Sequence, residues 1–232
     1  MKAQAGKCKL PMDSAFDLAP YIDHTLLKAT AGKAQIETLC RQAMEARFAA
    51  VCVPPYFVHQ AREATRNSPV KTATVIGFPL GYNCVEAKHQ EVLQALIDGA
   101  QELDIVINLA ALKASDWATL EREMELLLPA LIEAEAASKL IVESGILTEK
   151  ELTECCRFYA RFPIQFLKTS TGFAEAGATL EAVRLMRAAL PDHIQIKASG
   201  GIRNRTFALE LVEAGASRIG TSSSLDLVRV PS

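Results

Sequence analysis

Two lysines occupy matching positions at the ends of two short apolar runs. Lys168 lies in IQFLKTSTGF and Lys197 lies in HIQIKASGGI, and small residues follow each of them. An ammonium group at the end of a buried strand is costly to keep charged. Such a lysine is therefore a candidate for a lowered pKa and for attack on a carbonyl carbon. The pair indicates an enzyme that forms a Schiff base with its substrate.

The alternation of side chains along an extended strand predicts the direction of both amines. Lys197 shares the polar face of its run with Gln195. Lys168 shares its face with Ile164 and Phe166, so we expect its stem to rise from an apolar stack. Neighbouring strands lie about 4.8 Å apart, and two inward amines at that spacing would leave one neutral near physiological pH and the other an ammonium. The alternative, for either lysine taken singly, is a solvated residue at a strand end.

The segment QELDIVIN adds carboxylates to this chemistry. It places Glu102, Asp104 and Asn108 on one face and apolar residues on the other. A carboxylate within an apolar strand needs a partner, and inward lysines are suitable ones. We expect Asp104 to exchange protons, through water, with the hydroxyl group of the carbinolamine that precedes an imine. A structural ion pair remains the alternative, and it fits Glu102 as well as a catalytic role does.

Glycine and serine after the last two apolar runs predict an anion site. Gly200 and Gly201 follow one run, and the segment GTSSS, with Ser222 and Ser223, forms the end of the other. Backbone N–H groups can approach a phosphate where no Cβ intrudes, and serine hydroxyl groups add donors. Gly172 in TSTGF can supply a further backbone donor.

The elements that must position these residues alternate along the chain. Short β-branched or apolar runs predict strands at 21–25, 49–53, 72–77, 103–108, 139–143, 164–169, 194–199 and 218–221. Segments of helical period predict helices at 33–46, 84–98, 120–137, 149–159, 179–189 and 204–214. Eight strand–helix units predict a single-domain α/β (β/α)8 TIM barrel, with a doubly wound open sheet as the alternative.

The same pattern sets the expected domain limits. We expect one catalytic domain over 1–232, with an N-terminal extension at 1–20 and the barrel core at 21–224. Few residues follow the last strand, so the final helix must be short.

Composition narrows the classes of partner. The chain has 232 residues, 50% of them hydrophobic, and a net charge of -2. This balance gives no electrostatic case for nucleic acid or an anionic membrane, and a small soluble substrate is the better expectation. Six cysteines without a CxxC pair, and no hydrophobic leader, predict a reduced cytoplasmic protein. The four histidines make no HxH or HExxH spacing, so we expect no metal and no bound cofactor.

Seven segments together resemble the deoxyribose-phosphate aldolase family: YIDHTLLK, AVCVPP, VIGFP, ELDIVIN, FLKTSTGF, IKASGGIR and RIGTSSS. The resemblance runs from about Tyr21 to Ser224 and implies a (β/α)8 barrel, commonly a homodimer. It further implies a class I aldolase that reversibly cleaves 2-deoxy-D-ribose 5-phosphate, a small phosphorylated sugar, to acetaldehyde and D-glyceraldehyde 3-phosphate.

Carried over by residue, the resemblance makes Lys168 the Schiff-base lysine and Lys197 the second lysine that lowers its pKa. Asp104 becomes the acid and base that works through water, and Asp23 a residue near the sugar hydroxyl groups. The implied substrate and phosphate contacts are Thr171, Gly172, Gly200, Gly201, Ser222 and Ser223.

Two other functions remain open from the residues alone. One is a different barrel lyase or isomerase of phosphorylated sugars, which would share the phosphate site but act on another carbonyl compound. The other is a catalytically silent barrel that binds a sugar phosphate as a sensor. A sensor does not need two inward lysines together with a carboxylate, which favours an enzyme.

Overall fold

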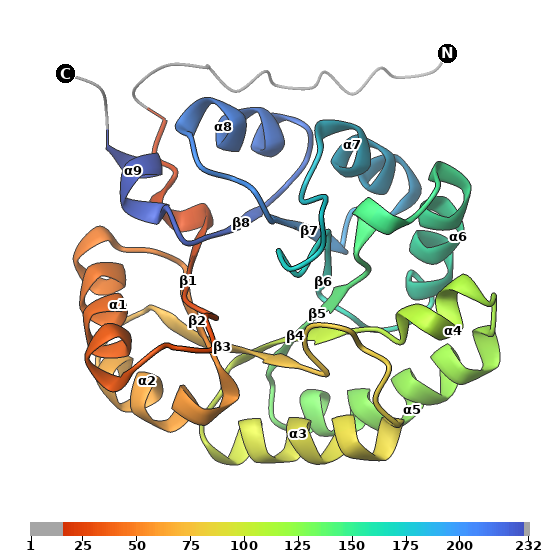
Figure 1. Cartoon of the computed structure of the whole chain (residues 1–232), viewed down its shortest axis with the longest axis horizontal. Helices are drawn as coiled ribbons and strands as arrows, with labels where there is room; N and C mark the ends of the chain where they lie inside the picture. Colours follow the sequence, from red (N-terminus) through yellow and green to blue (C-terminus); the bar gives the residue numbers. More distant parts are fainter. Residues whose placement is uncertain (1–15, 230–232) are drawn as a thin grey trace.

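Eight parallel strands close into a barrel in chain order, from β1 to β8, with β8 pairing back onto β1. The computed structural model describes residues 16–229, and Figure 1 shows their helices arranged as a ring around the strands. The predicted TIM barrel is therefore confirmed, and the open sheet is excluded by the β1–β8 pairing.

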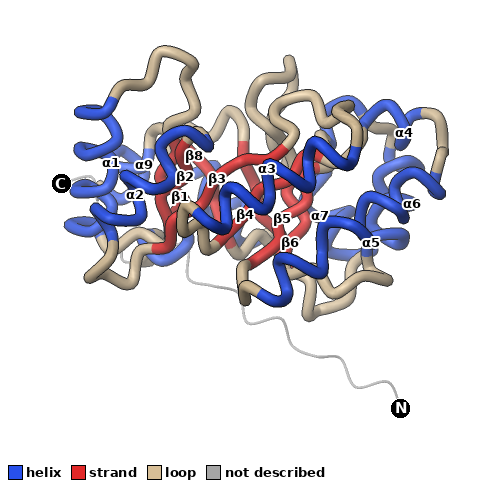
Figure 2. The backbone as a smooth tube through the Cα atoms, turned by 90° about the horizontal axis from the view of Figure 1, so that it is seen from below, coloured by secondary structure: helices blue, strands red, loops and turns tan. Residues whose placement is uncertain are grey.

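The strands match the predicted runs, and every boundary lies within two residues of its prediction. They are β1 Ile22–Thr25, β2 Ala50–Val53, β3 Lys71–Ile76, β4 Glu102–Val106, β5 Ala137–Ile141, β6 Phe166–Lys168, β7 Gln195–Ser199 and β8 Arg218–Thr221. Figure 2 shows these strands enclosed by the helices when the barrel is viewed from the side.

The helices include the six for which a range was predicted, the predicted short final helix and two more. They are α1 Lys33–Ala46, α2 Val58–Thr65, α3 Val85–Ile97, α4 Leu109–Lys113, α5 Trp117–Glu133, α6 Glu149–Tyr159, α7 Leu180–Ala189, α8 Arg205–Glu213 and α9 Ser224–Val228. The short final helix, α9, confirms the prediction for the eighth unit. The helices α2 and α4 were missed because each has few residues over which a period can be read.

The predicted helix at 120–137 was wrong at both ends. Helix α5 begins earlier, because the Asp116 side chain caps it by accepting a hydrogen bond from the Thr119 N–H group. It ends at Glu133, and Ala137 already begins β5. Of the predicted N-terminal extension, residues 1–15 lie outside the described residues, and so does Cys8.

The buried apolar side chains form two clusters of unequal size. The main core includes Ile105, Leu167 and Ile196, which alternate with inward residues of β4, β6 and β7. A second, smaller cluster lies on β2 and β3 and contains Ala50, Cys52, Ala73 and Val75, with Leu27 and Phe78 packed against it. Within residues 16–229, no helix is long and apolar enough to cross a bilayer.

A buried ion pair supports the end of β4. Lys88 on α3 and Glu123 on α5 form an ion pair in which the two side chains are only 0% and 2% exposed. Lys88 Nζ also donates to the Val106 carbonyl oxygen at 2.8 Å, and Glu123 accepts from the Asn108 N–H group at 3.1 Å. Burial lowers the pKa of Lys88 and raises the pKa of Glu123. The pair thus holds the loop that follows Asp104.

We expect Lys88→Met to lower the free energy of unfolding by about 3–5 kcal/mol, because Glu123 is left buried without its ammonium partner. Urea denaturation followed by circular dichroism measures this loss. The matched control is Arg122→Met, which removes the exposed ion pair with Glu86 and should change stability little. Equal stability of the two variants would contradict the assignment.

Candidate active site

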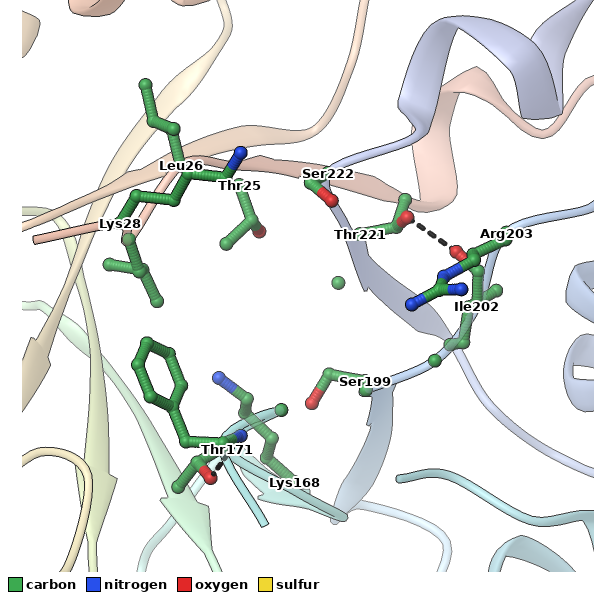
Figure 3. Close-up of a pocket in the computed structure, with 16 residues that line it drawn as sticks. Thr25, Leu26, Lys28, Lys168, Thr171, Ser199, Ile202, Arg203, Thr221 and Ser222 are labelled. Atoms are coloured by element: carbon green, nitrogen blue, oxygen red, sulfur yellow. Dashed lines mark hydrogen bonds between the residues drawn. The ribbon is translucent and has the colours of Figure 1, made fainter. Parts of the chain in front are cut away.

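A cavity of about 280 Å³ opens at the carboxyl ends of the strands. Lys168 at the end of β6 points its amine into this cavity, and Ser199 and Ser222 lie around the same space (Figure 3). The cavity is lined by Thr25, Leu26, Leu27, Lys28, Lys168, Thr171, Gly172, Phe173, Ser199, Gly200, Gly201, Ile202, Arg203, Gly220, Thr221 and Ser222. A parallel barrel presents its loops and strand ends here, which is where such folds carry function.

The two predicted lysines and the predicted carboxylate meet directly. Lys168 pairs with Lys197 in the register of β6 and β7. Lys168 Nζ donates to Asp104 Oδ2 at 2.7 Å, and Lys197 Nζ donates to the same oxygen at 2.5 Å. Asp104 is fully buried. One carboxylate oxygen therefore bridges two amines whose strands are neighbours.

Two further cations join them, neither of which was predicted from the sequence. Lys139 on β5 donates to Asp104 Oδ1 at 3.0 Å and to Glu102 at 2.5 Å. Arg218 on β8 donates to Asp23 at 2.7 Å and to Glu102 at 2.8 Å. We call this group the charged layer, and its members are Asp23, Glu102, Asp104, Lys139, Lys168, Lys197 and Arg218.

Strand parity could have identified Lys139. Its Cα pairs with that of Asp104 across β4 and β5, and it alternates with Leu140 of the main core. Arg218 begins its strand, so its inward position depends on the register with Lys197.

The charged layer gives the two catalytic candidates opposite protonation preferences. Burial lowers the pKa of Lys168; Asp104 opposes this shift and the nearby Lys197 adds to it. Burial alone would also lower the pKa of Lys197, but Asp104 and Asp23 outweigh it and raise that pKa above its usual value. Burial favours the neutral form of Asp104, yet the ammonium groups around it hold its pKa well below the usual range. The site therefore favours loss of a proton from Lys168 over loss from Lys197.

The expected apolar stack beneath Lys168 is wrong in one residue. Ile164 precedes β6, and it belongs to the main core together with Leu167. Phe166 does lie on the same side as Lys168, where its ring contacts Lys139 Nζ at 5.9 Å. The stem of Lys168 therefore rises beside charged groups rather than from a purely apolar column.

The two glycine loops form one side of the cavity. Gly172, Gly200 and Gly201 have φ values of 83°, 89° and 75°, which favour glycine. A Cβ on Gly200 would lie 2.9 Å from the Cα of Gly177, so the two loops pack too closely for any side chain. Arg203 also lines the cavity (Figure 3) and was not predicted. Open backbone and a guanidinium group suit an anion.

Thr171 lines the cavity, and hydrogen bonds to Glu143 hold it in place. Its hydroxyl and N–H groups both donate to the Glu143 carboxylate, with the N–H at 3.2 Å from Oε2. The Phe173 N–H group in turn donates to Thr171 Oγ1 at 3.1 Å. The ring of Phe173 meets Phe78 edge-on, with centroids 5.0 Å apart. The loop after β6 is therefore anchored to the segment after β5 and to the loop after β3.

Two predicted substrate residues do not line this cavity. Asp23 is 0% exposed and lies in the charged layer, against Arg218 and Lys197. Its place near the sugar hydroxyl groups stays a prediction. The Ser223 N–H group donates to Thr221 Oγ1 at 3.0 Å, and its side chain is absent from the cavity wall. Ser222 does line the cavity, as does Ser199.

No group of three or more His, Cys, Asp or Glu side chains within the described part of the chain is arranged to hold a metal ion. The His24 Nε2 atom forms a hydrogen bond with Gln42 Oε1, at a distance of 3.1 Å. Burial lowers the pKa of His24, which fits a structural residue.

Comparison with known proteins gives consistent matches. The model of the DeoC/LacD family aldolase matches residues 17–227. A deoxyribose-phosphate aldolase of Thermococcus gammatolerans is 47% identical over 214 residues, which cover 91% of this chain and 95% of the relative. One of Exiguobacterium sp. is 45% identical over 215 residues, with 91% and 96% covered.

Solved structures agree with the sequence relatives. The aldolase QR15 is 40% identical, with a TM-score of 0.87 over 91% of this chain and 94% of its own. The deoxyribose phosphate aldolase of Aeropyrum pernix, described as a unique tetramer, is 32% identical, with a TM-score of 0.85 over 91% and 89%. A matching family model, close relatives over almost the whole chain and a shared barrel place this chain in the DeoC/LacD aldolase family.

Proposed function

We propose that this chain is a class I aldolase that reversibly cleaves 2-deoxy-D-ribose 5-phosphate to acetaldehyde and D-glyceraldehyde 3-phosphate. The observation that carries the proposal is the amine of Lys168 in the cavity, within 2.7 Å of a carboxylate that it shares with Lys197. Relatives named deoxyribose-phosphate aldolase support the substrate. Family membership favours a lyase over a sugar-phosphate isomerase or a silent sensor.

In this mechanism the neutral Lys168 amine adds to the C1 carbonyl of the open-chain sugar and gives a carbinolamine. Loss of water gives a protonated imine, which acts as the electron sink. Removal of the proton from the C3 hydroxyl group breaks the C2–C3 bond and releases glyceraldehyde 3-phosphate. The bonding electrons form an enamine, which is protonated at C2 and hydrolysed to acetaldehyde. The sequence of steps needs no bound cofactor.

Asp104 and Lys197 are the proposed acid–base pair. The low pKa of Asp104 keeps it a carboxylate in the resting enzyme, where it can accept a proton through an intervening water. Lys197 holds a proton on the adjoining strand, 2.5 Å from the same carboxylate oxygen. Protons can thus pass between the carbinolamine hydroxyl group and the charged layer.

The proposed phosphate contacts are the backbone groups at Gly172, Gly200 and Gly201 together with the Ser222 hydroxyl group. All four residues line the cavity that contains the Lys168 amine. A phosphate on this side would leave the aldehyde end of the sugar free to reach Lys168. Arg203 is an added candidate for charge neutralisation.

We further propose a homodimer acting in the cytoplasm, with 1–232 as one catalytic domain and 21–224 as its barrel core. The described cysteines Cys40, Cys52, Cys84, Cys155 and Cys156 are free, which fits a reducing compartment. Exposed apolar side chains such as Tyr56 and Ile97, 89% and 78% exposed, are available for contact with a second copy.

Lys168→Ala should abolish both turnover and covalent trapping. Acetaldehyde with sodium borohydride should give a reduced adduct that peptide mapping by mass spectrometry assigns to Lys168 in the wild type. Lys113, an exposed lysine paired with Glu151, is the matched control position. Near-normal cleavage of deoxyribose 5-phosphate by Lys168→Ala would rule out the imine mechanism.

Lys197→Leu should shift activity to higher pH. Loss of the neighbouring ammonium raises the pKa of Lys168, so the neutral amine becomes scarcer at pH 7 and is recovered as the pH rises through the new value. Each unit of this shift lowers the rate about tenfold at neutral pH. The pH profile of kcat/KM measures it, and Lys197→Arg should retain a profile near the wild type. An unmoved profile for Lys197→Leu would refute the role of charge.

Ser222→Ala should raise KM for deoxyribose 5-phosphate by about tenfold, because a hydrogen bond to a charged group contributes about 1.5 kcal/mol. Trapping of unphosphorylated acetaldehyde should stay unchanged. Ser223→Ala is the matched control, since this serine does not line the cavity. If Ser223→Ala raises KM more than Ser222→Ala does, the proposed phosphate seat is misplaced.

A further inference from the structure

The charged layer holds an unequal number of opposite charges. Four of its members are cationic when protonated, Lys139, Lys168, Lys197 and Arg218, and three are carboxylates. Its lysines and aspartates are 0–3% exposed, so bulk solvent cannot neutralise the difference. A fully ionised layer would carry one surplus positive charge in a region of low dielectric, which is costly. The layer is balanced when one of its three lysines is neutral.

The contacts decide which lysine gives up its proton. Lys139 lies within 4.0 Å of three carboxylates, at 2.5, 3.0 and 3.8 Å. Lys197 lies 2.5 Å from each of two, Asp23 and Asp104. Among the residues that the structure describes, Lys168 contacts a single carboxylate, that of Asp104. The lysine with the fewest carboxylate partners holds its proton least firmly, and this is the lysine that faces the cavity.

We propose that Arg218 and Glu102, neither of which lines the cavity, are positioning residues that set the protonation state of Lys168 by fixing the charge surplus of the layer. The proposal rests on the Schiff-base function given above, because it explains how that amine comes to be neutral. It assigns opposite effects to the two residues.

Arg218 creates the surplus because its guanidinium group does not lose its proton in proteins. It lies 2.5 Å from Asp23 and 2.8 Å from Glu102, and so it binds two of the three carboxylates of the layer. Its Cα pairs with that of Lys197, and its guanidinium carbon lies 5.8 Å from the ring of Phe166, two residues before Lys168 on β6. The positive charge of Arg218 therefore lies in the same barrel interior as the Lys168 amine.

Glu102 acts in the opposite direction. Its carboxylate accepts from Lys139 at 2.5 Å and from Arg218 at 2.8 Å. It thus offsets part of the positive charge that Arg218 brings. Without Glu102, the layer would hold a larger surplus of positive charge, and the neutral form of Lys168 would be favoured more strongly.

Strands β2 and β3 add no buried charge to this balance, because Lys71 at the start of β3 is exposed. On β2, Cys52 faces the same interior, and burial raises the pKa of its thiol to about 11, so it is neutral at pH 7. The second apolar cluster places Ala73 and Val75 of β3 beside it. Asp23 on β1 is a member of the layer, and Lys28 and Arg203 line the cavity that the Lys168 amine faces.

The test is the pH dependence of imine formation on Lys168, measured as the rate of acetaldehyde trapping by borohydride relative to the wild type at each pH. Acetaldehyde carries no ionisable group. The pH at which the trapping rate is half-maximal, the midpoint, therefore reports the titration of groups in the protein. Arg218→Gln removes the surplus, and we expect the midpoint to rise by about one pH unit, with a roughly tenfold lower rate at pH 7. Arg218→Lys should restore a midpoint near the wild type.

Glu102→Gln should move the midpoint downward, the reverse of Arg218→Gln. This reversal separates control of charge from general damage to the barrel, which would not give opposite signs. Arg122→Gln, at an exposed ion pair with Glu86, is the matched control for the change of arginine to glutamine. Thermal unfolding of each variant confirms that the compared proteins are folded.

The outcomes distinguish this inference from the function on which it rests. If the wild type gives no adduct on Lys168, the Schiff-base function itself fails. If the wild type gives the adduct but Arg218→Gln leaves the midpoint unchanged, or Glu102→Gln moves it in the same direction, the charge-balance role is overturned. Should Arg218→Gln not fold, the sign of the Glu102→Gln shift decides alone.

Discussion

The contact of the Asp104 carboxylate with three lysine side chains inside a closed barrel is the interaction on which the site depends. One of its oxygens bridges Lys168 and Lys197, and the other accepts from Lys139. Burying a carboxylate without partners would cost several kcal/mol, and burying the lysines without it would cost as much. Each charge is thus held in place by the others, and removing one changes the proton affinity of the rest.

The barrel interior is divided between this charged layer and an apolar wall. Small residues of β2 and β3, Ala50, Cys52, Ala73 and Val75, occupy one side. The charged side chains come from β1 and from β4 to β8. The division lets an amine be desolvated from one direction while proton donors and acceptors remain within reach from the other. Such asymmetry is what shifts a lysine pKa without leaving buried charges unpaired.

The loops above the strands depend on the same register. Ser144 and Thr169 are joined by a backbone hydrogen bond of 2.7 Å, so the ends of β5 and β6 turn together. Glu143 then holds Thr171, which places the backbone of Gly172 on the cavity wall. Lys168 and Gly172 therefore lie on one continuous segment, which runs from the end of β6 onto the cavity wall.

Much of this molecule could be predicted from the order of its residues. Alternating strand and helix patterns indicated the barrel, because periodicity is a local property. The small residues after each lysine indicated strand ends, and the parity of QELDIVIN brought Asp104 toward the amines. Ile164 was misplaced because β6 begins only at Phe166, and parity has meaning only within the strand.

Closure of the barrel decided the rest. Arg218 reaches Asp23, 195 residues earlier in the chain, only because β8 pairs with β1. The same pairing places Asp23 in the charged layer, in contact with Arg218. Local patterns determined which residues lie on strands and which way they point. The pairing of charges depends on distances between strands that are far apart in sequence, and only the tertiary structure sets those distances.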